Sequence, residues 1–213
     1  MRRLLIGLSA FALGGTTAAA LSIAGNAKPP AASARQVVMP NVPEERVAVP
    51  AGSVRDALAK GLIDRPIRSV LRVAGRMGYG DYLWDDKGVP AGPTWVRVDL
   101  KSQILSVFRA GHEIGTTVIL YGGDGVPTPT GKFPVLAKFK DHRSATYDAP
   151  MPYTLRLTAD GVSIHASNVR WGYATHGCIG IPEAFAAKLF AAASIGDEVL
   201  IVEGKEPPAA ARS

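Results

Sequence analysis

The chain has 213 residues, of which 47% are hydrophobic and 20% are charged, a composition typical of a folded globular protein. The formal net charge of +6 suits a polyanionic setting such as an envelope surface. The basic residues are scattered and form no stripe interleaved with aromatic residues, so we expect no nucleic-acid partner. Cys178 is the single cysteine, which excludes a disulfide within the chain.

Residues 1–27 have the pattern of a secretory signal peptide. Two arginines precede an apolar stretch, and small residues lead up to Ala27, after which we expect cleavage. The apolar run over 4–24 is also long enough to span a bilayer, so the alternative is an uncleaved N-terminal anchor, which would then be the only membrane contact. Both interpretations predict an exported protein of the periplasm or cell envelope.

Two segments precede the main domain. Residues 28–52 contain five prolines among small and polar residues, which predicts an extended linker. Residues 53–93 are expected to be a short helical and loop-rich extension. A capping pattern begins one helix at Ser53, and apolar residues at helical spacing predict a second helix over 66–75.

From residue 94 onward the apolar residues recur with a period of two, which predicts strands. The expected strands cover 94–100, 104–108, 114–121, 132–139, 153–158, 161–167 and 198–202, and one helix covers 183–193. The pattern therefore predicts a mainly β domain, a sandwich or barrel with one or two short helices, over 94–203. Residues 204–213 are expected to be a disordered tail.

The strand predicted over 161–167 carries a histidine that can face a site. Strict alternation puts Ser163, His165 and Ser167 on one polar face, where we expect the histidine to be wet. Cys178 follows His165 by 13 positions (178 − 165), and the loop between them is long enough to return to the strand. A cysteine beside a histidine can become a thiolate–imidazolium pair, in which the thiolate is the nucleophile and the imidazole protonates a leaving amine.

Gly177, directly before the cysteine, lets the backbone approach a substrate, and the N–H groups of Gly177 and Cys178 could stabilise an oxyanion. Other interpretations of these residues remain open. Cys178 can be an inert core residue, and His165 and His176 can be structural or surface histidines. The same three residues could also be zinc ligands, although their spacing matches no known ligand pattern.

The string Thr175-His176-Gly177-Cys178 resembles the [Ser/Thr]-His-Gly-Cys signature of the L,D-transpeptidase catalytic domain (YkuD) family. Further segments resemble the family in the same order: the strand pair 96–108, the turn Thr128-Pro129-Thr130-Gly131, the upstream histidine in Ile164-His165, and the closing helix and strand over 185–201. The chain departs from the family pattern at Gly180, where Arg or Asn is frequent, and at Ala166, where Gly or Ser is common. The gap between the two histidines is also short.

The resemblance implies an L,D-transpeptidase-like fold and a peptidoglycan L,D-transpeptidase activity. Such an enzyme attacks a tetrapeptide stem, releases the terminal D-Ala, and passes the acyl group through a thioester to an amine in cell wall cross-linking or remodelling. Alternatives are an L,D-carboxypeptidase or endopeptidase that uses water, and a non-catalytic peptidoglycan-binding protein on the same fold.

The resemblance also assigns roles to residues of this chain. Cys178 becomes the nucleophile and His165 the acid/base, with the Ala166 carbonyl orienting the imidazole. Gly177 and His176 are supporting residues. The candidate substrate-binding residues are Tyr153, Trp171, Thr175 and Gly180. We expect peptidoglycan stem peptides as the partner, a monomer, and no metal or organic cofactor.

Overall fold

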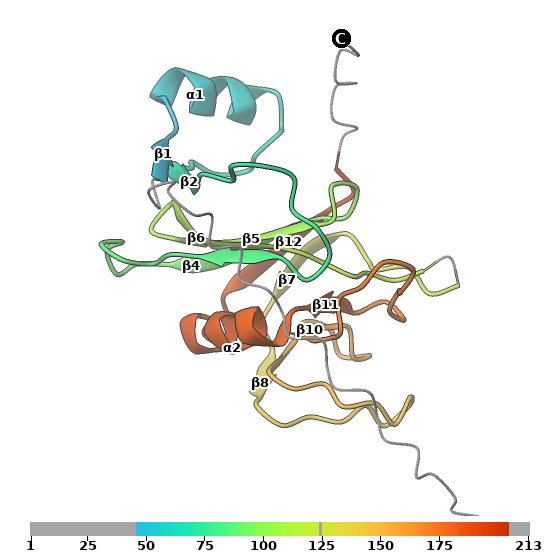
Figure 1. The fold of residues 1–213 in the computed structure, drawn as a ribbon. Coiled ribbons are helices and arrows are strands. Elements are labelled where there is room, and N and C mark those ends of the chain that lie inside the picture. Colours follow the sequence, from blue (N-terminus) through green and yellow to red (C-terminus); the bar gives the residue numbers. More distant parts are fainter. Residues whose placement is uncertain (1–45, 124, 205–213) are drawn as a thin grey trace, which may run out of the picture. The chain divides into compact units, whose positions relative to one another are not determined.

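The computed structural model describes residues 46–123 and 125–204, which form two β-sheets and two helices (Figure 1). The larger sheet has the strand order β1 (Arg46–Ala48), β2 (Ser69–Leu71), β6 (His112–Val118), β5 (Ile104–Arg109), β4 (Thr94–Asp99), β12 (Glu198–Val202) and β7 (Gly131–Pro134), with β3 (Tyr82–Trp84) also paired to β6. The smaller sheet has the order β11 (Ile179–Ile181), β10 (Ser163–Ala166), β9 (Thr154–Arg156) and β8 (Ala137–Phe139). The helices are α1 (Ala51–Ala59) and α2 (Glu183–Ala192).

The centre of the larger sheet is an antiparallel meander of β4, β5 and β6, as the alternating sequence predicted. The turn between β5 and β6 contains Ala110 and Gly111 with φ values of 51° and 84°. Two successive residues with positive φ give the turn the twist that a tight hairpin needs. The final strand β12 lies parallel to β4 and antiparallel to β7, so the C-terminal end of the domain is held inside the sheet.

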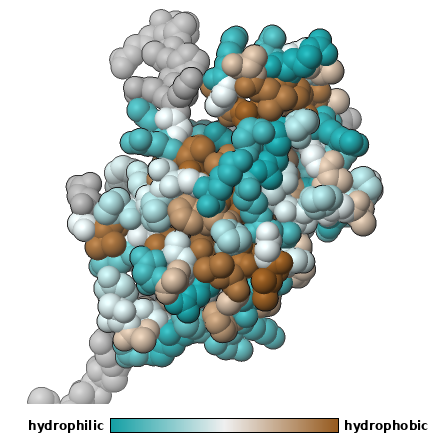
Figure 2. Space-filling view, turned by 180° about the vertical axis from the view of Figure 1, so that it is seen from behind, coloured by the Kyte–Doolittle hydropathy of each residue, from teal (hydrophilic) through white to brown (hydrophobic). Residues whose placement is uncertain are grey.

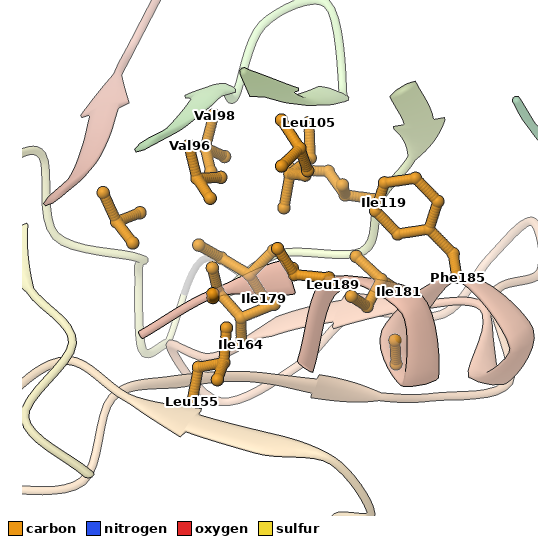
Figure 3. Packing of buried hydrophobic residues seen from close by; sticks show 14 of the residues in the cluster. Val96, Val98, Leu105, Ile119, Leu155, Ile164, Ile179, Ile181, Phe185 and Leu189 are labelled. Carbon is orange, nitrogen blue, oxygen red and sulfur yellow. The ribbon is translucent and has the colours of Figure 1, made fainter. Parts of the chain in front are cut away.

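The hydrophobic core lies between the two sheets and is completed by α2 (Figure 3). The labelled side chains come from three sources: Val96, Val98, Leu105 and Ile119 from the larger sheet and the segment that follows β6, Leu155, Ile164, Ile179 and Ile181 from the smaller sheet, and Phe185 and Leu189 from α2. Each of these side chains is at most 1% exposed. The sheet that carries the candidate site is thus anchored by the apolar alternate positions of its own strands.

Helix α2, which confirms the helix predicted over 183–193, begins after Pro182, whose φ of −57° suits a helix start, and it buries Phe185 and Leu189. Its C-terminal end is capped by a side chain from the smaller sheet. The Lys138 Nζ donates hydrogen bonds to the carbonyls of Phe190, at 2.7 Å, and Ala193, at 2.5 Å. A cation at this position satisfies carbonyl groups that the helix leaves free and complements its dipole.

The helix predicted over 66–75 is wrong, because Ser69–Leu71 is strand β2. This strand is antiparallel to β1 and meets β6 at the Ser69–His112 pair. The Leu71 N–H donates to the buried carboxylate of Glu113 at 2.8 Å. Backbone partners at the edge of β6 therefore outweigh the helical spacing of the apolar residues, which is a weak local preference.

The last residues of the predicted linker 28–52 belong to regular elements. The chain is already paired as β1 from Arg46, and α1 begins at Ala51 rather than Ser53. The predicted leader 1–27, the linker up to residue 45 and the tail from 205 onward lie outside the described residues. Neither helix in the described ranges combines the length and the hydropathy that a membrane crossing requires.

Phe185 is the side chain on which the contact between α2 and the larger sheet depends. It is fully buried, and its ring meets the rings of Tyr82 and Trp84 edge-on at centroid distances of 5.8 and 5.3 Å. We expect Phe185→Ala to lower the free energy of unfolding by about 3–5 kcal/mol in urea titrations. The control Ile195→Ala, at a side chain that is 67% exposed, should stay within about 0.5 kcal/mol of the parent. Equal losses in the two variants would contradict the packing described here.

Candidate active site

The parallel pairing of β10 with β11 brings the upstream histidine and the cysteine together. The register pairs Ile164 with Ile179 and His165 with Gly180, so Cys178 lies two register positions before the partner of His165. A strand spacing of about 4.8 Å and a rise of about 3.3 Å per residue place the Cα atoms of His165 and Cys178 roughly 8 Å apart. Cys178 is the residue directly before β11, so the pairing holds it beside the strand that carries His165.

The imidazole of His165 is held in one tautomer by the strand that carries it. Its Nδ1 lies 2.8 Å from the carbonyl oxygen of Ala166 and 3.3 Å from the hydroxyl of Ser167. A carbonyl only accepts hydrogen bonds, so Nδ1 carries the proton and Nε2 keeps its lone pair. The alternation predicted a solvent-exposed histidine, but His165 is only 8% exposed.

Burial is the main cause that lowers the pKa of His165 below its ordinary value. The hydrogen bond to Ala166 acts in the opposite direction, and the charge of nearby His142 lowers the pKa further. The imidazole is therefore neutral at pH 7. His142 lies in an irregular segment between β8 and β9, where its ring stacks on Phe139 with centroids 5.2 Å apart.

The thiol of Cys178 is half-buried, and its Sγ lies 3.8 Å from the carbonyl oxygen of Gly161, to which it donates. Burial raises the pKa of the thiol, and the charge of Asp160 raises it further, against a hydrogen bond from the Ser163 N–H. The resting pair is thus a thiol and a neutral imidazole rather than the ion pair suggested by the sequence.

The turn before the cysteine is fixed by hydrogen bonds from Thr175. Its hydroxyl donates to the carbonyl of Cys178, and its N–H donates to the carbonyl of Tyr121 at 3.0 Å. Gly177 has a φ of 91°, a conformation that favours glycine. Among the backbone hydrogen bonds outside the regular elements of the described chain, none is donated by the N–H groups of Gly177 or Cys178.

A second loop supports this turn from the side and explains the Thr-Pro-x-Gly pattern. The buried hydroxyl of Thr128 accepts a hydrogen bond from the Gly122 N–H at 2.8 Å. A Cβ on Gly122 would lie 2.2 Å from the carbonyl oxygen of Val126, so only glycine fits there. A Cβ on Gly177 would meet Pro127 and Val126 at 3.5 Å, which shows that the two loops are in contact.

The L,D-transpeptidase catalytic domain (YkuD) family model matches residues 93–201, just over half of the 213 residues. The chain belongs to this family. This match covers β4 to β12 and includes both strands of the candidate site.

A solved structure agrees with the fold. An L,D-transpeptidase from Stackebrandtia nassauensis is 25% identical, with a TM-score of 0.50 over 55% of this chain and 58% of that one. An L,D-transpeptidase from Enterococcus faecium is 28% identical (TM-score 0.48, 53% and 50% covered), and one from Mycobacterium smegmatis is 23% identical (TM-score 0.47, 51% and 58% covered). This chain therefore spans less than two thirds of each of these structures. A comparison with curated proteins found no significant match.

The departure from the family pattern at Gly180 has a steric reason in this chain. A Cβ on Gly180 would lie 2.8 Å from both the Cβ and the Oγ of Ser167, closer than real Cβ contacts allow. Ser167 therefore occupies the space that a side chain at position 180 would need. The sequence predicted Gly180 as a substrate-binding residue, and its contacts add a packing constraint at this position.

The two aromatic residues predicted to bind substrate have different settings. Trp171 is 80% exposed on the loop between β10 and β11, and its ring meets Tyr79 edge-on at 5.8 Å. Tyr153 packs its ring against Phe190 of α2, with ring centroids 5.9 Å apart. The supporting candidate His176 stacks on Tyr147 with ring centroids 4.3 Å apart.

Three neighbours of candidate residues were not predicted: His142 near His165, Asp160 near Cys178, and Tyr147 against His176. They lie in turns and irregular segments, which carry no periodic signal. Ser167 could have been found, because alternation places it on the face of His165. In the described residues, no group of three or more His, Cys, Asp or Glu side chains could hold a metal ion.

The contact between Ser167 and Gly180 can be tested with a double-mutant cycle. Gly180→Ala should lower the free energy of unfolding by about 1–3 kcal/mol, because the new methyl group meets Ser167. Combining it with Ser167→Gly should recover part of this loss, with a coupling of at least about 0.5 kcal/mol in urea titrations. The control Gly75→Ala, where a Cβ meets no atom within 4 Å, should change stability little. Strict additivity of Gly180→Ala and Ser167→Gly would contradict the steric explanation.

The neutral state of the pair predicts the pH dependence of alkylation. Only the thiolate reacts with iodoacetamide, and the raised pKa of Cys178 moves its formation above the ordinary value of about 8.5. The alkylation rate, followed by intact mass, should therefore rise about tenfold per pH unit from pH 5 to 8 without a plateau. A plateau with its midpoint below pH 7 would indicate a resting ion pair and contradict this prediction.

Proposed function

We propose that this chain is a peptidoglycan L,D-transpeptidase that acts in cell wall cross-linking or remodelling. The observation that supports the proposal is the pairing of β10 with β11, which holds Cys178 at the start of the strand beside that of His165 in a chain of this family. The expected setting is the periplasm or cell envelope, reached through the N-terminal leader, and the protein works as a monomer without a metal or organic cofactor.

In the first half of the reaction, Cys178 is the nucleophile. The Sγ attacks the carbonyl carbon before the terminal D-Ala of a tetrapeptide stem, and its proton passes to Nε2 of His165. The N–H groups of Gly177 and Cys178 stabilise the oxyanion. The C–N bond then breaks, the amine of D-Ala leaves with the proton from His165, and a thioester remains on Cys178.

In the second half, an amine attacks the thioester carbonyl and His165 accepts a proton from it. The C–S bond breaks, an amide forms, and the proton returns to the sulfur of Cys178. The hydrogen bond from Nδ1 to the Ala166 carbonyl keeps Nε2 as the acceptor in both halves. With water in place of the amine, the same steps give hydrolysis.

In this scheme, the neutral state that burial favours allows His165 to act as a base. A neutral imidazole can act as a base, whereas an imidazolium could only donate. The lowered pKa of His165 keeps it in the base form at neutral pH. The cost is a less reactive resting thiol, so we expect the proton to move as the bond to the substrate forms.

A carbapenem test addresses the first half directly. We expect intact-mass spectrometry to show a covalent adduct on the parent protein and none on Cys178→Ala. His165→Gln should slow formation of the adduct by about 10²–10⁴-fold, the usual contribution of a positioned base. His112→Gln is the matched control, because that side chain bonds to Ser69 at the far edge of the larger sheet.

Muropeptide analysis of sacculi incubated with the protein then separates the outcomes. New cross-links between third residues support transpeptidation, and loss of terminal D-Ala without cross-links supports hydrolysis. A folded parent protein that binds sacculi, forms no adduct and leaves the muropeptides unchanged would contradict the proposal and support the non-catalytic alternative.

A further inference from the structure

The turn between β9 and β10 lies directly against the candidate nucleophile. Its Gly161 carbonyl oxygen is the one that faces the Cys178 Sγ at 3.8 Å. The turn is closed by backbone hydrogen bonds from Leu157 to Val162 at 2.8 Å and from Gly161 to Thr158 at 3.3 Å. The backbone of this turn is therefore held beside the thiol, one residue after Asp160.

Asp160 is the charged residue of this turn, and it is exposed. One carboxylate oxygen, Oδ1, accepts a hydrogen bond from the hydroxyl of Thr158, which also accepts from the Val162 N–H at 2.9 Å. The neighbouring cation, Arg156, directs its guanidinium to the carbonyls of Thr158 and Ala159. The carboxylate is thus oriented by the turn and stays open to solvent.

This negative charge has the wrong sign for activating the cysteine. Cysteine nucleophiles are activated by a nearby cation, whereas Asp160 raises the pKa of the Cys178 thiol. An anion beside the nucleophile disfavours the thiolate in the first half-reaction. The same charge would attract a cationic reactant. In the proposed reaction, the acceptor amine is that reactant, because an alkyl amine is a cation at neutral pH.

We propose that Asp160 recognises the amine acceptor, binding its ammonium group beside the thioester. This inference rests on the proposed function and adds the residue that favours amine over water. The bound ammonium gives one proton to solvent, and the free amine attacks the thioester carbonyl. The C–N bond forms, the C–S bond breaks, and the second amine proton passes through His165 to the Cys178 sulfur.

The test compares two acceptors on the same acyl-enzyme. The donor is a tetrapeptide whose side-chain amine is acetylated, so that it cannot serve as acceptor. D-Methionine provides a cationic amine, and hydroxylamine provides a nucleophile that is uncharged at neutral pH. Mass spectrometry quantifies the amide, hydroxamate and hydrolysis products of the full chain and its variants.

Asp160→Asn should lower kcat/KM for D-methionine by about 2–5-fold, the scale of an exposed ion pair, and shift product toward hydrolysis. The hydroxylamine rate should stay unchanged, and the acylation rate should stay unchanged or rise. Asp160→Lys should reduce transfer to D-methionine further, whereas Asp160→Glu should retain it. Asp56→Asn, at an exposed carboxylate on α1, controls for the change in net charge.

Two results would overturn the inference. One is an Asp160→Asn variant that affects the two acceptors equally, and the other is a variant that lowers acylation alone. Absence of acylation in the parent protein would refute the proposed function itself, and the separately measured acylation rate distinguishes that failure from a failure of acceptor recognition.

Discussion

The parallel pairing of β10 with β11 is the constraint on which the candidate site depends. Parallel neighbours cannot be joined by a tight hairpin, so the chain must leave β10, cross over as a loop and return. That loop carries the His-Gly-Cys turn and delivers Cys178 to the strand of His165. The register is fixed by Ile164 and Ile179, which are fully buried between the sheets. A slip by one residue would turn the histidine into the core and its apolar neighbours outward.

The same pairing controls the chemistry through burial. Desolvation shifts the two pKa values in opposite directions: it lowers the pKa of His165 and raises the pKa of Cys178. A buried ion pair would have to offset the loss of hydration of two charges, which costs several kcal/mol for each ion before their attraction is counted. The neutral pair avoids this cost at rest. In the proposed reaction, charge then develops only when a substrate carbonyl is present, together with the N–H groups that receive its negative charge.

The sequence predicted those elements in which the spacing of the apolar residues shows which face is buried. The strands β4, β5 and β12 and the helix α2 follow from alternation and helical spacing, because each buries one face against the same core. The helix predicted over 66–75 is wrong. The apolar spacing of this segment suits a helix, but the edge of β6 offers it backbone partners. The strand β11 has three residues, too few for a period. His142 and Asp160 act through space from irregular segments, so only the folded chain places them at the site.

Ser167 and Gly180 show how one departure from a family pattern is accommodated by a neighbour. Position 180 lies level with His165 in the register, where a long side chain would stand beside the imidazole. Here the Ser167 side chain fills that space, and its hydroxyl lies 3.3 Å from Nδ1 of His165. Both polar neighbours of Nδ1, Ala166 and Ser167, therefore come from the chain that directly continues from the histidine. The orientation of the imidazole then depends on β10 and its extension alone, while β11 is left to position the nucleophile.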